Sequence, residues 1–146
     1  MCVDAKMKVP RTILYAIQAI VELSKDAPGA PVSSHTLASR GKMPERFLVQ
    51  ILRCLVSGGI LHSVQGVSGG YFLARSIEHI TLLNVWDSLD TADRPIIPKV
   101  GGLAPELHER LTNAMEQIWE AARSELSRHT VADVAGSHNG LCASRH

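Results

Sequence analysis

The sequence predicts a mainly α-helical protein with a small β-hairpin: a winged helix-turn-helix domain plus a long C-terminal dimerisation helix. Three observations carry this prediction. Two short helical patterns are joined by a turn that contains glycine, as in a helix-turn-helix. A strand, a glycine-rich turn and a second strand follow at once, as in a wing. An apolar stripe at helical spacing then runs for over five turns near the C-terminus.

The composition is that of an ordinary globular protein. The 146 residues are 45% hydrophobic and 20% charged, and this length suits one domain with a real core. No apolar run reaches the ~18–20 residues of a membrane span, and the first residues lack a signal-peptide pattern. We therefore expect a cytoplasmic protein without membrane contact. Cys2, Cys54 and Cys142 are far apart and odd in number, which predicts free thiols.

Charge is distributed unevenly along the chain. Residues 1–75 hold nine Lys/Arg against four Asp/Glu, a net charge of +5, and residues 76–146 hold six against ten, a net charge of −4. A basic front half joined to an acidic back half indicates a polyanionic partner for the front half alone.

Three helices are expected before the hairpin. Arg11–Lys25 has apolar residues at helical spacing, after Pro10 and before a Pro/Gly turn. A short helix opens at Ser33 and Ser34, because serine is a favoured N-cap. A third runs from Pro44 to Ser57. Its predicted apolar stripe consists of Phe47, Leu48, Ile51, Leu52 and Leu55.

The hairpin is expected to follow the third helix directly. Gly58 and Gly59 end that helix, Ile60–Gln65 is typical of a strand, and Tyr71–Ala74 of the returning strand. The turn between the strands is rich in glycine, which permits close approach of the backbone to another molecule. We interpret this hairpin as the wing.

The C-terminal part is expected to hold a short helix at 82–89, a loop, a long helix at Pro105–Arg128 and a capped turn after Thr130. The long helix has no partner of similar length in the chain, so a second copy in a homodimer is expected to cover it. The expected domains are 1–80 for DNA binding, 81–135 for linker and dimerisation, and 136–146 as a disordered tail. The predicted interface residues are Leu107, Leu111, Met115, Ile118, Ala122 and Leu126.

A winged helix-turn-helix indicates double-stranded DNA as partner. A recognition helix reads bases with residues near its N-terminus, where arginine pairs with guanine and glutamine with adenine. Serine hydroxyls, helix N-termini and basic side chains suit phosphate, and Arg53 fits an intrachain ion pair equally well. The residues expected to contact DNA are Lys8, Arg11, Ser33, Ser34, Pro44, Glu45, Arg46, Val49, Gln50, Arg53 and the wing residue Ser68.

Three motifs resemble one known family. They are Tyr-Ala-Ile-x-Ala-Ile-x-x-Leu at Tyr15–Leu23, Met-Pro-Glu-Arg-Phe-Leu at the start of Met43–Leu55, and a stretch ending Gly-Gly-Tyr-Phe-Leu-Ala within Gly58–Ala74. Across residues 7–135 the chain resembles the Rrf-two family of bacterial winged-helix regulators, the family of the iron–sulfur cluster regulator IscR. The resemblance implies a homodimer on a roughly palindromic operator. It also implies DNA contacts from Pro44, Arg46, Val49, Gln50 and Gln65.

Two features depart from the family pattern. Cluster-binding members carry three cysteines before the long helix, but Thr91–Ala104 holds none. We therefore expect no iron–sulfur cluster, no other cofactor and no metal site, with His108 as an ordinary helix residue. At position 65 many members have arginine in the minor groove. Gln65 keeps hydrogen bonding without the charge, which predicts weaker minor-groove binding.

The leading hypothesis is a sequence-specific transcriptional regulator, expected to be a homodimeric repressor that answers to an unidentified small molecule or protein. Two alternatives stay open: a protein-interaction module that docks a partner enzyme, and a thiol-based redox sensor that uses Cys54. An enzyme is not expected, because the sequence shows no nucleophile–base arrangement and no dinucleotide-binding fingerprint.

Overall fold

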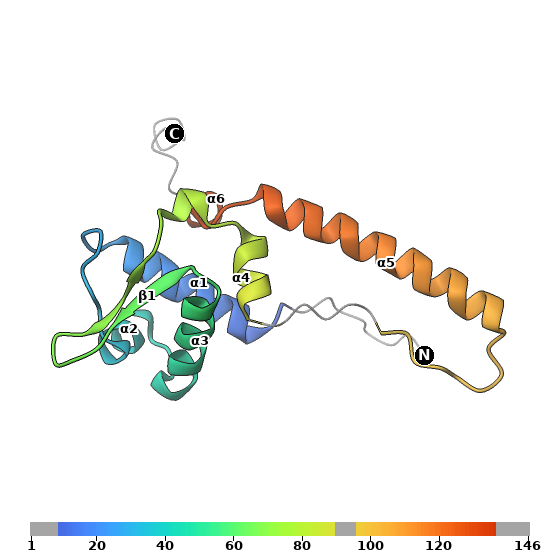
Figure 1. Cartoon of the computed structure of the whole chain (residues 1–146), viewed down its shortest axis with the longest axis horizontal. Helices are drawn as coiled ribbons and strands as arrows, with labels where there is room; N and C mark the ends of the chain where they lie inside the picture. The colour runs from blue at the N-terminus through green and yellow to red at the C-terminus, as the bar shows by residue number, and fades with distance from the viewer. Residues whose placement is uncertain (1–8, 90–95, 137–146) are drawn as a thin grey trace, which may run out of the picture.

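A computed structural model describes residues 9–89 and 96–136. It is mainly helical, with a two-stranded antiparallel hairpin and one long helix that extends from a compact body (Figure 1). The predicted fold class is therefore confirmed. The elements are α1 (Arg11–Ser24), α2 (Ser34–Gly41), α3 (Glu45–Ser57), β1 (Leu61–Val64), β2 (Gly70–Leu73), the 3₁₀ helix η1 (Ile77–His79), α4 (Leu82–Ser88), α5 (Pro105–Arg128) and α6 (Val131–Ala135).

The core lies where α1 meets the helix-turn-helix. Ala16 and Ala19 of α1 are fully buried, and their small side chains let α2 and α3 approach closely. Each leucine that α2 and α3 bury in this cluster contributes roughly 1.5–3 kcal/mol. The packing of α1 against these two helices therefore accounts for much of the stability. The same cluster contains Val85 of α4 and Val131 of α6, so elements beyond residue 80 pack into the same body. The largest side chains in it are Ile20, Leu37, Leu48, Leu52, Leu55, Ile60, Leu61, Ile80, Val85 and Val131.

The predicted apolar stripe of α3 is wrong at one position. Leu48, Ile51, Leu52 and Leu55 are buried, but the side chain of Phe47 is 60% exposed. The buried positions follow the three- and four-residue spacing of one helix face, and Phe47 lies at the edge of that face. It borders a hollow on the surface instead of filling the core.

The first strand of the wing is shorter than predicted, and the wing forms an additional contact, with Val32, that was not predicted. Strand β1 pairs with β2 in the register Leu61↔Leu73 to Val64↔Gly70. Tyr71 also forms an antiparallel bridge with Val32, just before α2: the amide of Val32 donates to Tyr71 O over 2.9 Å, and the amide of Tyr71 donates to Val32 O over 2.8 Å. The wing is thereby fixed to the start of the helix-turn-helix.

Arg75 holds the base of the wing in place. Its Nε donates to His79 O over 2.9 Å, one terminal nitrogen donates to Gly59 O over 3.3 Å, and the other to Asn84 Oδ1 over 3.2 Å. Asn84 in turn completes a capping box with Thr81 at the start of α4. One guanidinium therefore joins the turn after α3, the unpredicted helix η1 and α4.

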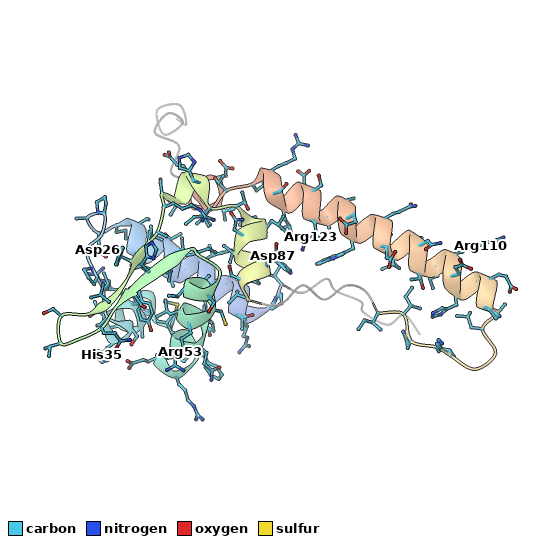
Figure 2. The ribbon with its side chains drawn as sticks, in the orientation of Figure 1. Asp26, His35, Arg53, Asp87, Arg110 and Arg123 are labelled. Atoms are coloured by element: carbon cyan, nitrogen blue, oxygen red, sulfur yellow. The ribbon has the colours of Figure 1, made fainter. Side chains whose placement is uncertain are left out.

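Helix α5 is attached to the body at its C-terminal end and leads away from it (Figure 1). Arg123 faces Asp87 of α4 (Figure 2) and binds its two carboxylate oxygens over 2.8 and 3.2 Å. This hydrogen bonding raises the pKa of Arg123 above its ordinary value. Beyond α5, the amide of Val131 donates to Ile80 O over 2.8 Å. The helix bounds Pro105–Arg128 agree with the prediction.

The apolar stripe of α5 is largely uncovered in the single chain. No residue of this helix is buried. The side chains of Leu107, Leu111 and Ile118 are 53, 43 and 60% exposed. Ala122 is also exposed, while Met115 and Leu126 are half-buried. A helix with such a face is stable only when another surface covers it.

Gly70 tests the attachment of the wing. A Cβ at this position would clash with the carbonyl group of Val32 and lie 2.8 Å from the Ser33 amide nitrogen. We expect Gly70→Ala to lower the free energy of unfolding by about 2–4 kcal/mol, measured by urea denaturation at fixed protein concentration. Gly101→Ala is the control, because a Cβ there meets nothing within 4 Å. Equal stability of the two variants would contradict the proposed close contact.

Candidate nucleic-acid interface

The N-terminus of α2 is built around Ser33. Its Oγ accepts a hydrogen bond from the amide of Thr36 over 3.1 Å and lies 2.9 Å from the hydroxyl of Thr36. This is an N-cap, which satisfies one of the free amides that open a helix. Ser33 is exposed and Ser34 is half-buried. The partial positive charge of this helix end therefore faces the surface.

The turn between α2 and α3 sets the position of the third helix. Lys42 adopts a left-handed conformation with φ 51°, and the amide of Met43 donates to Ala38 O over 2.9 Å. Pro44 then occupies the N-cap position of α3. Met43 is buried, so the turn is held by packing as well as by hydrogen bonds.

Glu45 joins the two helices of the motif. Ser34 Oγ donates to Glu45 Oε1 over 3.4 Å, and His35 Nδ1 lies 3.3 Å from Glu45 Oε2. The carboxylate predicted to contact DNA is thus occupied by α2 within the chain. Its observed contacts orient α3 against α2, and a direct DNA contact from it stays a prediction.

The outer face of α3 carries uncompensated positive charge. Arg46, Gln50 and Arg53 are exposed, and Val49 is half-buried. Neither arginine forms an ion pair with any residue in 9–89 or 96–136. The alternative prediction, an intrachain ion pair of Arg53, is therefore not observed among the described residues.

Arg40 of α2 differs from these two arginines. Its Nη1 donates to Asp26 Oδ2 over 2.6 Å, and this hydrogen bond raises the pKa of Arg40 above its ordinary value. Because Asp26 neutralises it, Arg40 adds little to the positive charge of the motif. The front half of the chain therefore offers fewer free cations than its composition indicates.

A cleft of about 570 Å³ lies between α2, α3 and the wing. Three elements contribute predicted DNA contacts to it: the N-terminus of α2, Arg53 of α3 and Gln65 of the wing. Figure 2 shows Arg53 on α3 and His35 on α2. The cleft combines hydroxyls, a helix N-terminus and an unpaired guanidinium, the groups that bind phosphate oxygens in protein–DNA complexes. The predicted residues that line it are Ser33, Ser34, Arg53 and Gln65.

The remaining predicted residues are not gathered in this cleft. Arg11 lies with Pro44 and Gln50 around a second hollow of about 380 Å³, which is mostly apolar. Arg46 and Val49 line neither space, and Ser68 is exposed in the wing turn. Lys8 lies outside the described residues.

Sequence reasoning missed several residues at both spaces. Ser63 of β1 lines the cleft and is exposed, although strand alternation puts it on the same face as the buried Leu61, so no sequence signal indicated it. Tyr15 and Phe47 line the second hollow. Both have apolar side chains at helical spacing, so their sequence pattern is indistinguishable from that of core residues. Cys54 is half-buried at this hollow, and Cys2 and Cys142 lie outside the described residues.

These elements define the class of the protein, a winged helix-turn-helix DNA-binding protein. The chain belongs to the Rrf2 family, the Rrf-two family named above, whose profile is described as "Iron-dependent Transcriptional regulator" and matches residues 9–137. Rv1287 of Mycobacterium tuberculosis is 34% identical over 135 residues, covering 89% of this chain and 82% of the relative. CymR of Bacillus subtilis is 26% identical over 138 residues, covering 92% and 94%. Both are named as HTH-type transcriptional regulators, and the chain is a DNA-binding transcriptional regulator of this kind.

Solved structures share the fold. CymR, the global cysteine regulator of B. subtilis, superposes with a TM-score of 0.66 at 22% identity, over 92% of this chain and 100% of that chain. IscR of T. potens superposes with a TM-score of 0.68 at 23% identity, over 96% and 94%. These neighbours confirm the winged helix followed by a long C-terminal helix.

The residues of this chain do not fit an iron–sulfur cluster of the family type. Within the two described stretches, no three His, Cys, Asp or Glu side chains come close enough together to hold a metal ion. His108 Nδ1 is buried without a hydrogen-bond partner in this part of the chain, but a single imidazole is not a cluster site, which needs thiolates. The segment 96–104 offers no thiol.

Over the described residues, none of the helices combines the length and the apolar character needed to cross a bilayer.

Removal of the α2 cap provides a test of this interface's architecture. We expect Ser33→Ala to lower the free energy of unfolding by about 1 kcal/mol, because the Thr36 amide loses its acceptor. Ser39→Ala, at an exposed site in the same helix, serves as control and is expected to have little effect, since alanine favours helix. Circular dichroism during urea denaturation measures both. A loss of stability that is no larger for Ser33→Ala would contradict the cap.

Proposed function

We propose that this protein is a homodimeric, sequence-specific DNA-binding repressor that works without an iron–sulfur cluster. The observation that carries the proposal is the cleft between α2, α3 and the wing, which places the unpaired Arg53 beside two serines at a helix N-terminus. One strand of the DNA backbone would lie in this cleft. Helix α3 on one side would then enter the major groove, and the wing on the other would reach the minor groove.

The exposed face of α3 supplies the groups for base recognition. Arg46 precedes Gln50 by one helical turn, and both residues are exposed. Arg46 forms no ion pair within the described residues. Arginine pairs with guanine and glutamine with adenine in the major groove. At the wing, Gln65 would donate or accept hydrogen bonds without a charge, so the minor groove would contribute less affinity than an arginine gives.

Two copies would meet through α5. The exposed Leu107, Leu111 and Ile118 share one face, and a 24-residue helix is about 36 Å long. A twofold dimer of such helices would present two α3 helices to half-sites about 34 Å apart, or a multiple of that distance. Residues 1–80 would then act as the DNA-binding domain and 81–135 as the linker and dimerisation region.

DNA binding is tested on a site selected from random duplexes. We expect Arg53→Ala to weaken binding to all sequences and to reduce the slope of log affinity against log salt by about 1, because one phosphate contact is lost. Arg46→Ala is expected to cost about 1–3 kcal/mol and to relax the preference at one base pair. Fluorescence anisotropy at several salt concentrations measures both.

The control for these variants is Arg110→Ala, which removes an arginine from the far end of α5 (Figure 2). Its DNA affinity is expected to equal that of the wild type. Wild-type binding that does not change with salt, or an Arg53→Ala slope equal to the wild-type slope, would overturn the proposed phosphate contact.

The dimer is tested on α5 itself. We expect Leu111→Asp to convert the dimer to monomers at micromolar concentration, because a carboxylate in an apolar interface is costly to desolvate. Asn113→Asp introduces the same charge on the opposite face of the helix and is expected to stay dimeric. Sedimentation velocity measures both. A monomeric wild type, or dissociation of both variants alike, would rule out this interface.

A further inference from the structure

We propose that the hollow between α1, α3 and the end of α4 binds a small aromatic anion, and that its occupancy weakens the hold of α3 on DNA. The regulatory part of this inference rests on the proposed function. The binding part does not, because it concerns a cavity of the chain alone.

The cavity has the size and lining of a small-molecule site. Its volume of about 380 Å³ falls in the roughly 300–1,000 Å³ range of such sites. Tyr15, Ile51 and Leu89 provide apolar walls from three different helical segments. Phe47 stands at the edge of the cavity and is 60% exposed. A flat aromatic molecule would cover the Phe47 ring and leave water, which is the usual driving force for binding in an apolar pocket.

The charge at one side of the cavity selects an anion. Arg11 lines the cavity and forms no ion pair with any described residue. It also opens α1, whose N-cap residue Pro10 provides no side-chain hydrogen bond to the first amides. The positive end of the helix therefore adds to the guanidinium charge. Among the described residues, no acidic side chain lines the cavity, so the nearest charge that these residues offer a bound carboxylate or sulfonate is the attractive charge of Arg11.

The position of the cavity couples it to DNA recognition. Pro44, the N-cap residue of α3, and Gln50, which is predicted to read bases, both line this cavity. Arg11 is itself a predicted phosphate contact, so a bound anion would neutralise it. A ligand that prefers the DNA-free protein must lower the affinity for DNA by the same factor by which DNA lowers the affinity for the ligand.

The probe for this site is 1-naphthoate, with 1-naphthalenemethanol as its neutral counterpart of similar shape. Isothermal titration of the full chain without DNA is expected to show 1-naphthoate binding at least tenfold tighter than the alcohol. Amide signals of Thr12, Tyr15 and Cys54 are expected to shift in ¹H–¹⁵N spectra. Equal binding of acid and alcohol, or shifts that spare these residues, would overturn the anion site.

Two variants and one control locate the binding. Phe47→Ala is expected to weaken 1-naphthoate at least tenfold by removing the stacking surface, and Arg11→Gln by removing the charge. Arg110→Gln removes an arginine far from the cavity and is expected to bind like the wild type. Circular dichroism melting verifies that each variant is folded. If Phe47→Ala instead converts a dimer to monomers and the wild type does not bind the acid, a second copy covers the cavity and the proposal fails.

The DNA experiment separates this inference from the proposed function. At a concentration that fills the wild-type site but leaves the Phe47→Ala site largely empty, 1-naphthoate is expected to lower operator affinity at least fivefold in the wild type and to have little effect on Phe47→Ala. Ligand binding without any operator binding would contradict the proposed function and leave the site intact. Operator binding that 1-naphthoate does not alter would remove the regulatory role.

Discussion

The pair of backbone hydrogen bonds between Val32 and Tyr71 determines the geometry of the whole candidate interface. Val32 lies just before α2, and Tyr71 belongs to strand β2 of the wing. The two sides of the cleft are therefore joined by main-chain atoms. Main-chain hydrogen bonds do not depend on side-chain rotamers, which makes the width of the cleft a property of the fold. Gly70 is the residue that permits this approach, because any side chain there would meet Val32 and Ser33.

Much of the fold follows from the sequence because its signals are periodic and local. Helix α5 was predicted with its observed bounds, since a proline begins it and its apolar residues recur at regular spacing. The Val32–Tyr71 bridge was not predictable, because a single paired residue has no period. Phe47 was misplaced because periodicity identifies a face but not its edge. The three hydrogen bonds of Arg75 join segments that are distant in sequence, and no local pattern indicates them.

The site was predictable as a set of residues but not as an arrangement. Ser33, Ser34, Arg53 and Gln65 were each named from the sequence, yet only the structure brings them into one cleft. Counting charges in the sequence does not show which cations are free. Arg40 is paired with Asp26 and Lys25 with Glu22, so these two cations are less available to DNA, while the net charge of the front half is unchanged. Electrostatic attraction to DNA then depends on a few unpaired side chains, which favours selectivity over strong non-specific binding.

The single attachment of α5 has a mechanical consequence. Its C-terminal end is held by the two hydrogen bonds of Arg123 to Asp87 and by the burial of α6, whereas Pro105 lies about 27 Å further along the helix axis. A rotation of a few degrees at the Asp87 end would therefore displace the far end by a few ångströms. Helix α4, which carries Asp87, ends beside the hollow that Leu89 lines. Because α5 meets the body only near its C-terminal end (Figure 1), small movements of α4 would be enlarged along the length of the long helix.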